Sequence, residues 1–149
     1  MKILLLSDNH NSHIDLDLLS YDLVIHCGDY GLEREYLEKN NVKYVRGNCD
    51  YIGPKEITLE FNGKKIYVIH GDIYNVKYNL QRLIYRSMEQ NVDYTIFGHT
   101  HIPNMVVHDN ITLINPGAFK DGYYAVIEDD YVTFYLNNTI YKKFKTSWW

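Results

Sequence analysis

The sequence predicts an α/β fold in a single domain covering residues 1–149, and three features support this fold class. In the first third, short apolar runs alternate with a helical segment, which is the pattern of parallel strands joined by crossovers. In the middle, an Asn-Gly pair separates two strand-like runs and signals a hairpin. The last third is rich in strand-like runs separated by turn residues. Together these features indicate parallel and antiparallel strands in two packed sheets, with helices outside.

Three strands and a short helix are predicted near the N-terminus. Residues 2–7 (KILLLS) form an apolar run closed by a polar residue, as expected of a parallel strand buried on both faces. Residues 22–26 repeat this pattern, and residues 42–46 repeat it more weakly. The segment 33–40 favours a short helix. The link 11–21 is short for a full crossover, so any helix there should be stunted.

A hairpin and a longer helix are predicted next. The runs ITLEF and KKIYVIH flank Asn62-Gly63, which is a strong signal for a two-residue turn. From Asn75 to about Gln90, apolar residues recur at helical spacing and predict an amphipathic helix. The apolar stripe of this helix comprises Val76, Leu80, Leu83, Ile84 and Met88.

The last third of the chain is predicted to consist mainly of strands. The expected strands are residues 94–97, 105–108, 111–115, 123–127 and 131–136. Two acidic or amide pairs, Asp109-Asn110 and Asp129-Asp130, are expected to form hairpin turns. The segment that follows is interpreted as a short basic tail containing Lys142, Lys143 and Lys145.

The composition excludes several classes of protein. Fifteen basic and nineteen acidic side chains give a net charge of -4, which argues against binding to duplex nucleic acid through charge. No apolar stretch approaches the length of a membrane span, and MKILLLSDN turns polar too early for a signal peptide. Two cysteines are too few for a disulfide framework. We expect a cytoplasmic protein with no membrane or nucleic-acid partner, and the sequence leaves open whether it forms a homo-oligomer.

A polar cluster follows each of five predicted strands. These clusters are SDNH at 7–10, GD at 28–29, GNCD at 47–50, HGD at 70–72 and GHTH at 98–101. Each cluster alone has an ordinary explanation, such as a turn, a helix cap or a buried histidine. However, ligands in α/β sheets bind at the carboxyl ends of strands, where loops from several units meet. The joint occurrence of the clusters therefore favours one shared site.

The clusters contain side chains that can bind metal ions. Asp8 and His10 are two residues apart, as are His99 and His101, and in an extended segment such residues point to the same side. The carboxylate of Asp29 has two oxygens and can bridge two cations. The set lacks an obvious thiolate ligand and therefore suits manganese, iron, cobalt, nickel or zinc better than a structural cysteine-rich site. The remaining candidate donors are the amide of Asn48 and the imidazole of His70.

The order of these motifs resembles a known family. DNH, GD, GNCD, HG and GHTH, in this order over most of the chain, resemble the signature of the calcineurin-like metallophosphoesterases, specifically their small prokaryotic-type phosphodiesterase branch. The NPGA segment at residues 115–118 is similar to the closing turn of that branch. The resemblance implies a four-layer sandwich of two mixed β-sheets flanked by helices, in agreement with the elements predicted above.

The resemblance also implies a centre with two divalent metal ions, for which manganese is the first choice and nickel, cobalt, iron and zinc are alternatives. One ion would be bound by Asp8, His10, Asp29 and His101. The other would be bound by Asp29, Asn48, His70 and His99, with Asp29 as the bridge. A hydroxide shared by the ions would attack the phosphorus of a small phosphodiester in line. Asp29 and Asn48 would thus act in catalysis as ligands.

Cys49 stands where many relatives carry a histidine that is thought to protonate the leaving oxygen. The branch that this sequence resembles shares the cysteine, and its members are commonly described as phosphodiesterases. A thiol is a less obvious acid than an imidazole at neutral pH. We therefore expect diesters, or substrates with good leaving groups, to be preferred over alkyl phosphate monoesters, with Cys49 as a candidate acid.

Other aromatic side chains lie near the motif loops. Tyr51, Tyr74 and Tyr78 could stack on a base, although buried packing is the favoured interpretation for each. His13, His26 and His108 are interpreted as structural.

The sequence leaves two alternatives to an enzyme that hydrolyses small phosphodiesters. The resemblance includes a retromer subunit that keeps this fold, has lost metal-ligand histidines and serves as a platform for protein binding, whereas every expected ligand is present here. A nuclease of the same superfamily should carry extra domains and a basic track, and the sequence shows neither. The alternatives are thus a catalytically silent scaffold and a nuclease.

Overall fold

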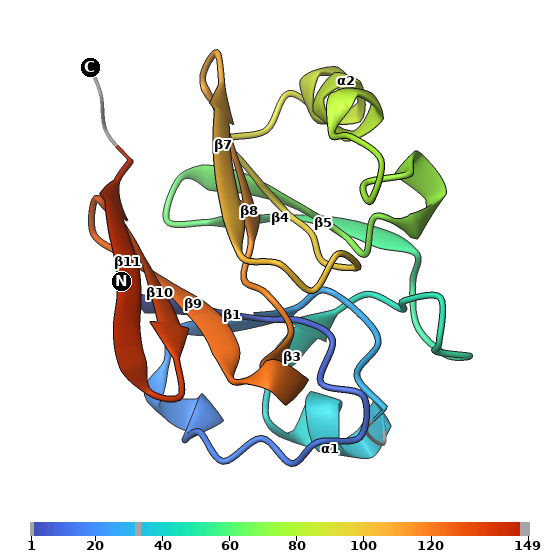
Figure 1. Ribbon diagram of the computed structural model, residues 1–149, viewed down its shortest axis with the longest axis vertical. Coiled ribbons are helices and arrows are strands. Elements are labelled where there is room, and N and C mark those ends of the chain that lie inside the picture. Colours follow the sequence, from blue (N-terminus) through green and yellow to red (C-terminus); the bar gives the residue numbers. More distant parts are fainter. Residues whose placement is uncertain (1, 32–33, 147–149) are drawn as a thin grey trace.

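The computed structural model describes residues 2–31 and 34–146, which form two stacked β-sheets (Figure 1). The first sheet has the order β11 (Thr139–Lys145), β10 (Tyr131–Leu136), β9 (Tyr123–Glu128), β1 (Lys2–Leu6), β2 (Leu23–His26) and β3 (Val42–Tyr44). The second has the order β4 (Glu56–Phe61), β5 (Lys64–Ile69), β6 (Tyr94–Ile96), β8 (Ile111–Asn115) and β7 (Asn104–His108). Both sheets are mixed, because parallel strands form the β1-β2-β3 and β5-β6-β8 portions and antiparallel strands complete each sheet.

Three apolar clusters define the layers. The largest cluster fills the space between the sheets and includes Leu5, Val68 and Phe134. A second cluster covers the outer face of the first sheet, where α1 (Arg34–Lys39) and the 3-10 turn η1 (Leu18–Ser20) pack. A third packs α2 (Gln81–Gln90) on the outer face of the second sheet, as Figure 1 shows. The predicted fold class, two mixed sheets between helical layers, is confirmed.

Strand β1 illustrates how the sequence produces these layers. Its successive side chains alternate between the inter-sheet cluster, which contains Ile3 and Leu5, and the outer cluster, which contains Leu4 and Leu6. All four are at most 1% exposed, so the strand is apolar throughout rather than alternating with polar residues. Burial of each such side chain contributes on the order of 1.5–3 kcal/mol relative to exposure.

The predicted hairpin turns are present. Asn62 and Gly63 both have positive φ angles (51° and 78°), as a type I′ turn between β4 and β5 requires. Asp109 and Asp129 also have left-handed φ angles (53° and 54°), and they connect β7 to β8 and β9 to β10.

The predicted helix at 75–90 begins later than expected. It starts at Gln81: the left-handed Asn75 (φ 52°) ends the 3-10 turn η2 (Asp72–Tyr74), and residues 75–80 form turns rather than helix. The apolar residues from Val76 to Met88 therefore do not form one helical stripe, and Met88 is 46% exposed. Neither α2 nor any other helix among residues 2–31 and 34–146 is long and apolar enough to cross a membrane.

The interpretation of the C-terminal lysines as a tail was wrong. They lie in β11, which pairs antiparallel with β10 across a turn at Asn137 and Asn138. These asparagines have φ angles of 50° and 65°, so the turn chemistry resembles that of Asn62-Gly63 and was overlooked in the sequence. In contrast, the link 11–21 contains only the short turn η1, as its length predicted.

Candidate metal centre

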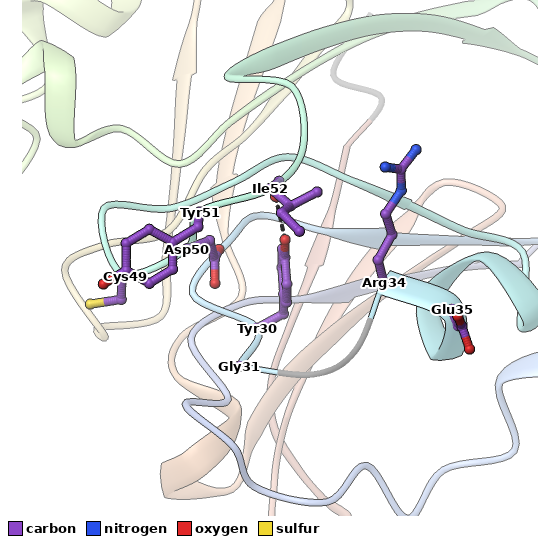
Figure 2. Close-up of a pocket in the computed structure, with 8 residues that line it drawn as sticks. All are labelled: Tyr30, Gly31, Arg34, Glu35, Cys49, Asp50, Tyr51 and Ile52. Atoms are coloured by element: carbon purple, nitrogen blue, oxygen red, sulfur yellow. Dashed lines mark hydrogen bonds between the residues drawn. The ribbon is translucent and has the colours of Figure 1, made fainter.

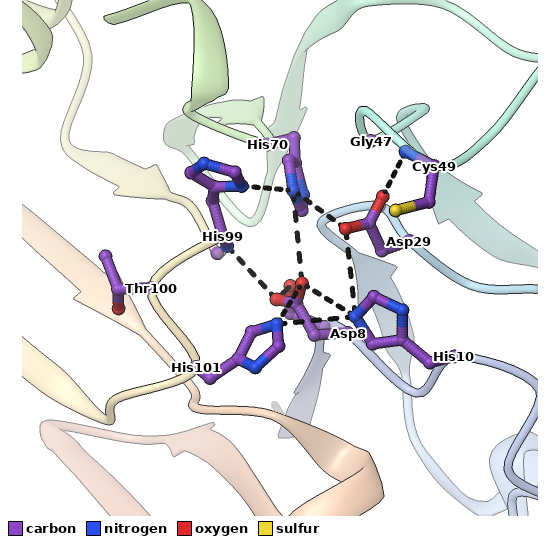
Figure 3. Close-up of polar contacts among 12 residues, drawn as sticks. Asp8, His10, Asp29, Gly47, Cys49, His70, His99, Thr100 and His101 are labelled. Atoms are coloured by element: carbon purple, nitrogen blue, oxygen red, sulfur yellow. Dashed lines mark hydrogen bonds and ion pairs between the residues drawn. The ribbon is translucent and has the colours of Figure 1, made fainter. Parts of the chain in front are cut away.

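Loops that follow five strands converge at one end of the two sheets (Figure 3). The loops after β1, β2 and β3 come from the first sheet, and those after β5 and β6 come from the second. They bring together six of the seven predicted ligands, Asp8, His10, Asp29, His70, His99 and His101. The ligand atoms fall into two groups of three, Asp8-His10-His101 and Asp29-His70-His99.

Asp8 is the centre of the first group. Its carboxylate is fully buried, and Oδ2 accepts hydrogen bonds from Ser7 Oγ (2.5 Å) and from the His99 backbone N–H (3.1 Å). Its other oxygen, Oδ1, has no hydrogen-bond partner among the described residues. This oxygen faces three imidazoles, since the Nε2 atoms of His101, His10 and His70 lie at 3.3, 3.5 and 3.9 Å.

Asp29 lies between the two groups. Its Oδ1 accepts a hydrogen bond from the backbone N–H of Cys49 (2.8 Å). Its Oδ2 lies 3.2 Å from His70 Nε2 and 3.8 Å from His10 Nε2, so one carboxylate contacts a histidine of each group. This is the position that a bridging ligand requires.

The histidines also face one another. His10 Nε2 and His101 Nε2 are 3.3 Å apart, and His70 Nε2 is 3.1 Å from His99 Nδ1. The Nδ1 atom of His70 donates to the carbonyl oxygen of Cys27 (2.8 Å), so that in the neutral imidazole the lone pair of Nε2 points at Asp29 and His99. A backbone carbonyl that orients the outer nitrogen of a histidine is a common support for a metal ligand.

These contacts fit bound cations. The lone pair of an imidazole nitrogen repels a carboxylate oxygen that faces it, unless a proton or a cation lies between the two. In the metal-free protein a proton meets part of this need: burial would lower the pKa of His70, but the hydrogen bond and charge of Asp29 together with Asp8 raise it above its ordinary value. Burial and the neighbouring His70 lower the pKa of His99, which therefore stays neutral. Burial would raise the pKa of Asp29, but His70 holds it well below its usual range.

The ligands converge through left-handed backbone, and the extended geometry expected from the two-residue spacing was wrong. Left-handed φ angles occur at Asp8 (53°), His10 (44°), Asp29 (55°), His99 (71°) and His101 (67°). Such conformations cost on the order of 1–3 kcal/mol each and persist where surrounding contacts impose them. His99 and His101 nevertheless lie in different groups, which is the division between two ions that the resemblance implied.

Backbone hydrogen bonds between loops impose this geometry. Asp8 N–H donates to Gly28 O, His10 N–H donates to Asp29 O, and Gly98 N–H donates to His70 O, each at 3.0 Å. Within each sheet, neighbouring loops are therefore tied to one another, which offsets the strain of the individual residues.

Glycines in the motifs make room for the carboxylates. A Cβ at Gly98 would lie 2.0 Å from Ser7 Oγ and 2.7 Å from Asp8 Oδ2. A Cβ at Gly47 would lie 2.1 Å from Asp29 Oδ1. Both distances are far below van der Waals contact, so each glycine is required by the packing of a ligand.

Asn48 and Cys49 lie on an exposed loop at the rim of the site. The amide nitrogen of Asn48 is 3.8 Å from Cys49 Sγ, and its role as a ligand stays a prediction. Cys49 Sγ lies within 4.8 Å of ligand atoms of both His10 and Asp29. Partial burial and the charge of Asp29 raise the pKa of the Cys49 thiol, which therefore stays protonated at neutral pH.

Several supporting residues were not singled out from the sequence. Asp50 Oδ2 accepts hydrogen bonds from the backbone N–H groups of Asp29 and Gly47, both at 2.7 Å. Asn115 donates to Gly98 O (3.2 Å) and to Thr100 Oγ1 (2.9 Å), which orients the loop that carries two histidines. Both residues belong to motifs quoted above, GNCD and NPGA, but the spacing alone does not distinguish a ligand from its support.

His26 is structural, as predicted. It is fully buried, its Nδ1 accepts a hydrogen bond from Gly28 N–H (3.1 Å), and its Nε2 donates to Asn9 Oδ1 (2.6 Å). Burial, with a smaller contribution from His70, lowers the pKa of His26 to about 3, so it stays neutral. It thereby holds the loops after β1 and β2 together without entering the groups of ligands.

Comparison with known proteins identifies the family. Residues 1–138 match the calcineurin-like phosphoesterase superfamily domain. The chain belongs to this superfamily. The probable metallophosphoesterase YsnB of Bacillus subtilis is 34% identical over 128 residues, which cover 80% of this chain and 76% of the relative. The resemblance inferred from the motifs is therefore confirmed, and the chain is assigned as a metal-dependent phosphoesterase.

Two solved structures share the fold. A predicted phosphoesterase from Streptococcus pneumoniae has a TM-score of 0.81 and 25% sequence identity, with 97% of both chains covered. Vps29 of Entamoeba histolytica, whose structure was solved in complex with zinc, has a TM-score of 0.80 and 17% identity, with 99% of this chain and 100% of that chain covered. The second likeness concerns the fold alone.

Gly98→Ala should weaken metal binding. The added methyl group must displace Ser7 Oγ or the Asp8 carboxylate, and loss of such outer support typically costs about 10–100-fold in metal affinity. Calorimetric titration with manganese should therefore give at least about a tenfold weaker affinity. The control is Gly63→Ala, where a Cβ meets nothing within 4 Å and the left-handed turn is strained far from the site. Equal affinities for Gly98→Ala and the unchanged protein would contradict this role.

Stabilisation by metal should increase with pH. The proton on His70, whose folded pKa is raised, stabilises the metal-free protein fully below the unfolded pKa of about 6.5, and this contribution is lost as pH rises through the raised value. A cation replaces that proton, so the rise in Tm on adding manganese should grow between about pH 5.5 and pH 8. The exposed residue His108 provides a control, since His108→Gln should leave this trend unchanged. A pH-independent rise in Tm would refute the exchange of proton for metal.

Proposed function

We propose that this protein is a binuclear metal-dependent phosphodiesterase that hydrolyses small phosphate diesters. The observation that carries the proposal is the buried Asp8 Oδ1, which lacks a hydrogen-bond donor among the described residues and faces three imidazole nitrogens. Asp29 joins this group of donors to a second one. Two groups of nitrogen and oxygen donors that share a carboxylate support a pair of cations rather than one.

The ligands would divide between the ions as the resemblance implies. Asp8, His10, Asp29 and His101 would hold one ion, and Asp29, Asn48, His70 and His99 the other. The exposed side chain of Asn48 lies on the loop next to Cys49 and would have to turn toward Asp29 to serve as a ligand. Manganese is our first choice, and nickel, cobalt, iron and zinc suit the same donors. When bound, the cations would lower the pKa of a water molecule that serves as the nucleophile and would neutralise charge on the phosphate.

The charge of the site supports an anionic substrate. The histidines that bind metal do so as neutral imidazoles, so the formal negative charge of the ligands comes from Asp8 and Asp29 alone. Two divalent ions exceed this negative charge, and the centre would keep a net positive charge. A phosphodiester anion would therefore be attracted to it.

Cys49 would act on the leaving group. Its thiol lies beside His10 and Asp29, and in the metal-free protein burial and the charge of Asp29 raise its pKa, so that it carries a proton at neutral pH. However, a thiol with a raised pKa is a weak acid, so it assists an alkoxide less than an imidazolium would. This weakness supports diesters with good leaving groups as the preferred substrates.

A catalytically silent scaffold is the second candidate. Its support is that the fold is common to Vps29 and to phosphoesterases. The convergence of six potential ligands, two of them buried carboxylates, counts against it, because a scaffold has no need to bury uncompensated acceptors.

Hydrolysis of bis(p-nitrophenyl) phosphate tests the proposed function. Metal-stripped protein refilled with manganese, nickel or zinc should hydrolyse this diester faster than p-nitrophenyl phosphate. Asp29→Ala should lower the rate by more than about 100-fold. Loss of a residue that only hydrogen-bonds to a metal ligand already lowers metal affinity or activity by about 10–100-fold, and Asp29 is itself a proposed ligand. The exposed Asp15 gives a control, Asp15→Ala, that should keep full activity. Binding of two ions per chain without turnover of any diester or of plasmid DNA would favour the scaffold.

Cys49→Ser should reveal an acid role through the leaving group. Since p-nitrophenolate leaves without a proton, the rate with p-nitrophenyl esters should change little. For diesters of increasingly basic alcohols, the rate of hydrolysis should fall by up to about 100-fold, which is the lower end of the range for general acid catalysis. The measurement is the slope of log kcat against the pKa of the leaving alcohol, and equal slopes for both proteins would remove the acid role.

A further inference from the structure

A cavity of about 490 Å³ opens beside the candidate metal centre. Its volume falls in the range of about 300–1,000 Å³ that is typical of sites for small molecules. As Figure 2 shows, Cys49 and Tyr51 lie at one end, Tyr30 and Ile52 lie in the middle, and Arg34 lies toward α1 at the other end. Because Cys49 also contacts the group formed with His10 and Asp29, the cavity begins where the leaving group of a phosphodiester would lie.

The wall of the cavity is held in place by hydrogen bonds. Tyr30 OH donates to the carbonyl oxygen of Ile52, and burial together with Asp50 raises the pKa of Tyr30 to about 12, so the phenol keeps this proton. Asp50 Oδ2 ties the same loop to the backbone of Asp29 (2.7 Å) and of Gly47 (2.7 Å). The loop is therefore preorganised before a ligand binds, which lowers the entropy cost of binding.

This fixed loop exposes apolar side chains. Tyr51 is 94% exposed and Ile52 is 52% exposed, whereas the sequence had favoured burial of Tyr51. The exposed ring of Tyr51 does not stabilise the loop by packing. It offers a flat surface on which an aromatic group of a ligand can stack. Tyr78 was also expected to be buried and is 88% exposed, but it lines a different cavity together with Tyr74 and Tyr85.

The far end of the cavity carries charges of both signs. Arg34 Nε donates to Glu38 (2.8 Å), which orients the guanidinium, and Glu35 lines the same end. A second phosphate would be repelled by Glu35. A purely apolar group would match neither the Glu35 carboxylate nor the terminal nitrogens of Arg34, because the ion pair with Glu38 uses Nε. A neutral heteroaromatic ring with donors and acceptors on its edge matches this mixture.

We propose that this cavity is the subsite for the leaving arm of the diester, and that the arm is a nucleoside whose base stacks on Tyr51 and whose polar edge meets Arg34 and Glu35. The assignment rests on the proposed phosphodiesterase function for the direction of cleavage. Tyr51 and Arg34 are then residues that determine specificity, and they do not take part in the chemical step.

Titration with adenosine tests the subsite without requiring turnover. Adenosine added to metal-free and zinc-loaded protein should shift the NMR signals of residues 30, 34, 51 and 52, whereas ribose should not. Tyr51→Ala should weaken binding about tenfold, the value expected for one stacked base, and Tyr51→Phe should retain it. The control is Tyr78→Ala, which removes an equally exposed ring from another cavity. Arg34→Ala should weaken adenosine binding and leave the binding of manganese unchanged.

Kinetics separate the subsite from the proposed function. Adenosine should inhibit hydrolysis of bis(p-nitrophenyl) phosphate competitively, with an inhibition constant about tenfold higher in Tyr51→Ala. If the diester is hydrolysed but adenosine neither binds nor inhibits, the subsite is refuted and the phosphodiesterase stands. If adenosine binds as expected but no diester is hydrolysed with any metal, the proposed function fails, while the NMR result supports a nucleoside site in the cavity.

Discussion

The structure at the candidate centre depends on one electrostatic constraint. Carboxylate oxygens and imidazole nitrogens meet in a buried space, and there are too few protons between them to cancel their repulsion. The carboxylates of Asp8 and Asp29 lie side by side with four imidazoles, and one oxygen of Asp8 has no donor among the residues described. An uncompensated buried carboxylate is costly to fold. The site is therefore built for cations, and the rest of the fold supplies the means to hold the acceptors together in spite of their repulsion.

Those means are left-handed loops, glycines and hydrogen bonds between neighbouring loops. Five of the six convergent ligands have positive φ angles, which place their side chains where an extended chain could not. Gly47 and Gly98 leave space for carboxylate oxygens, and Asp50 binds the backbone of two loops with a single oxygen. A site of this kind concentrates strain in its loops, and the two packed sheets provide the rigidity that sustains it.

The fold and the convergence of six candidate ligands could be predicted from the sequence, because both are tied to strand ends. Apolar runs such as KILLLS identify strands buried on two faces, and the polar residues after them identify one edge of the sheets. The sequence did not predict the start of α2, because residues 75–80 form turns although their apolar residues continue the spacing of the helix. It also missed β11, whose exposed and charged residues lack the apolar alternation of a half-buried strand. The exposure of Tyr51 depends on the tethering of its loop by distant residues, which no local pattern records.

The centre draws its ligands from both sheets, and this has a consequence for the order of events during folding. Asp8 and the His99 backbone that donates to it are separated by 91 positions along the chain. Contacts of such long sequence separation form late, because the entropy of closing a long loop is lost before the contact contributes. During synthesis the first sheet's ligands leave the ribosome well before those of the second. A partly made chain therefore holds an incomplete set of donors, and we expect metal to bind tightly only when the two sheets have packed together.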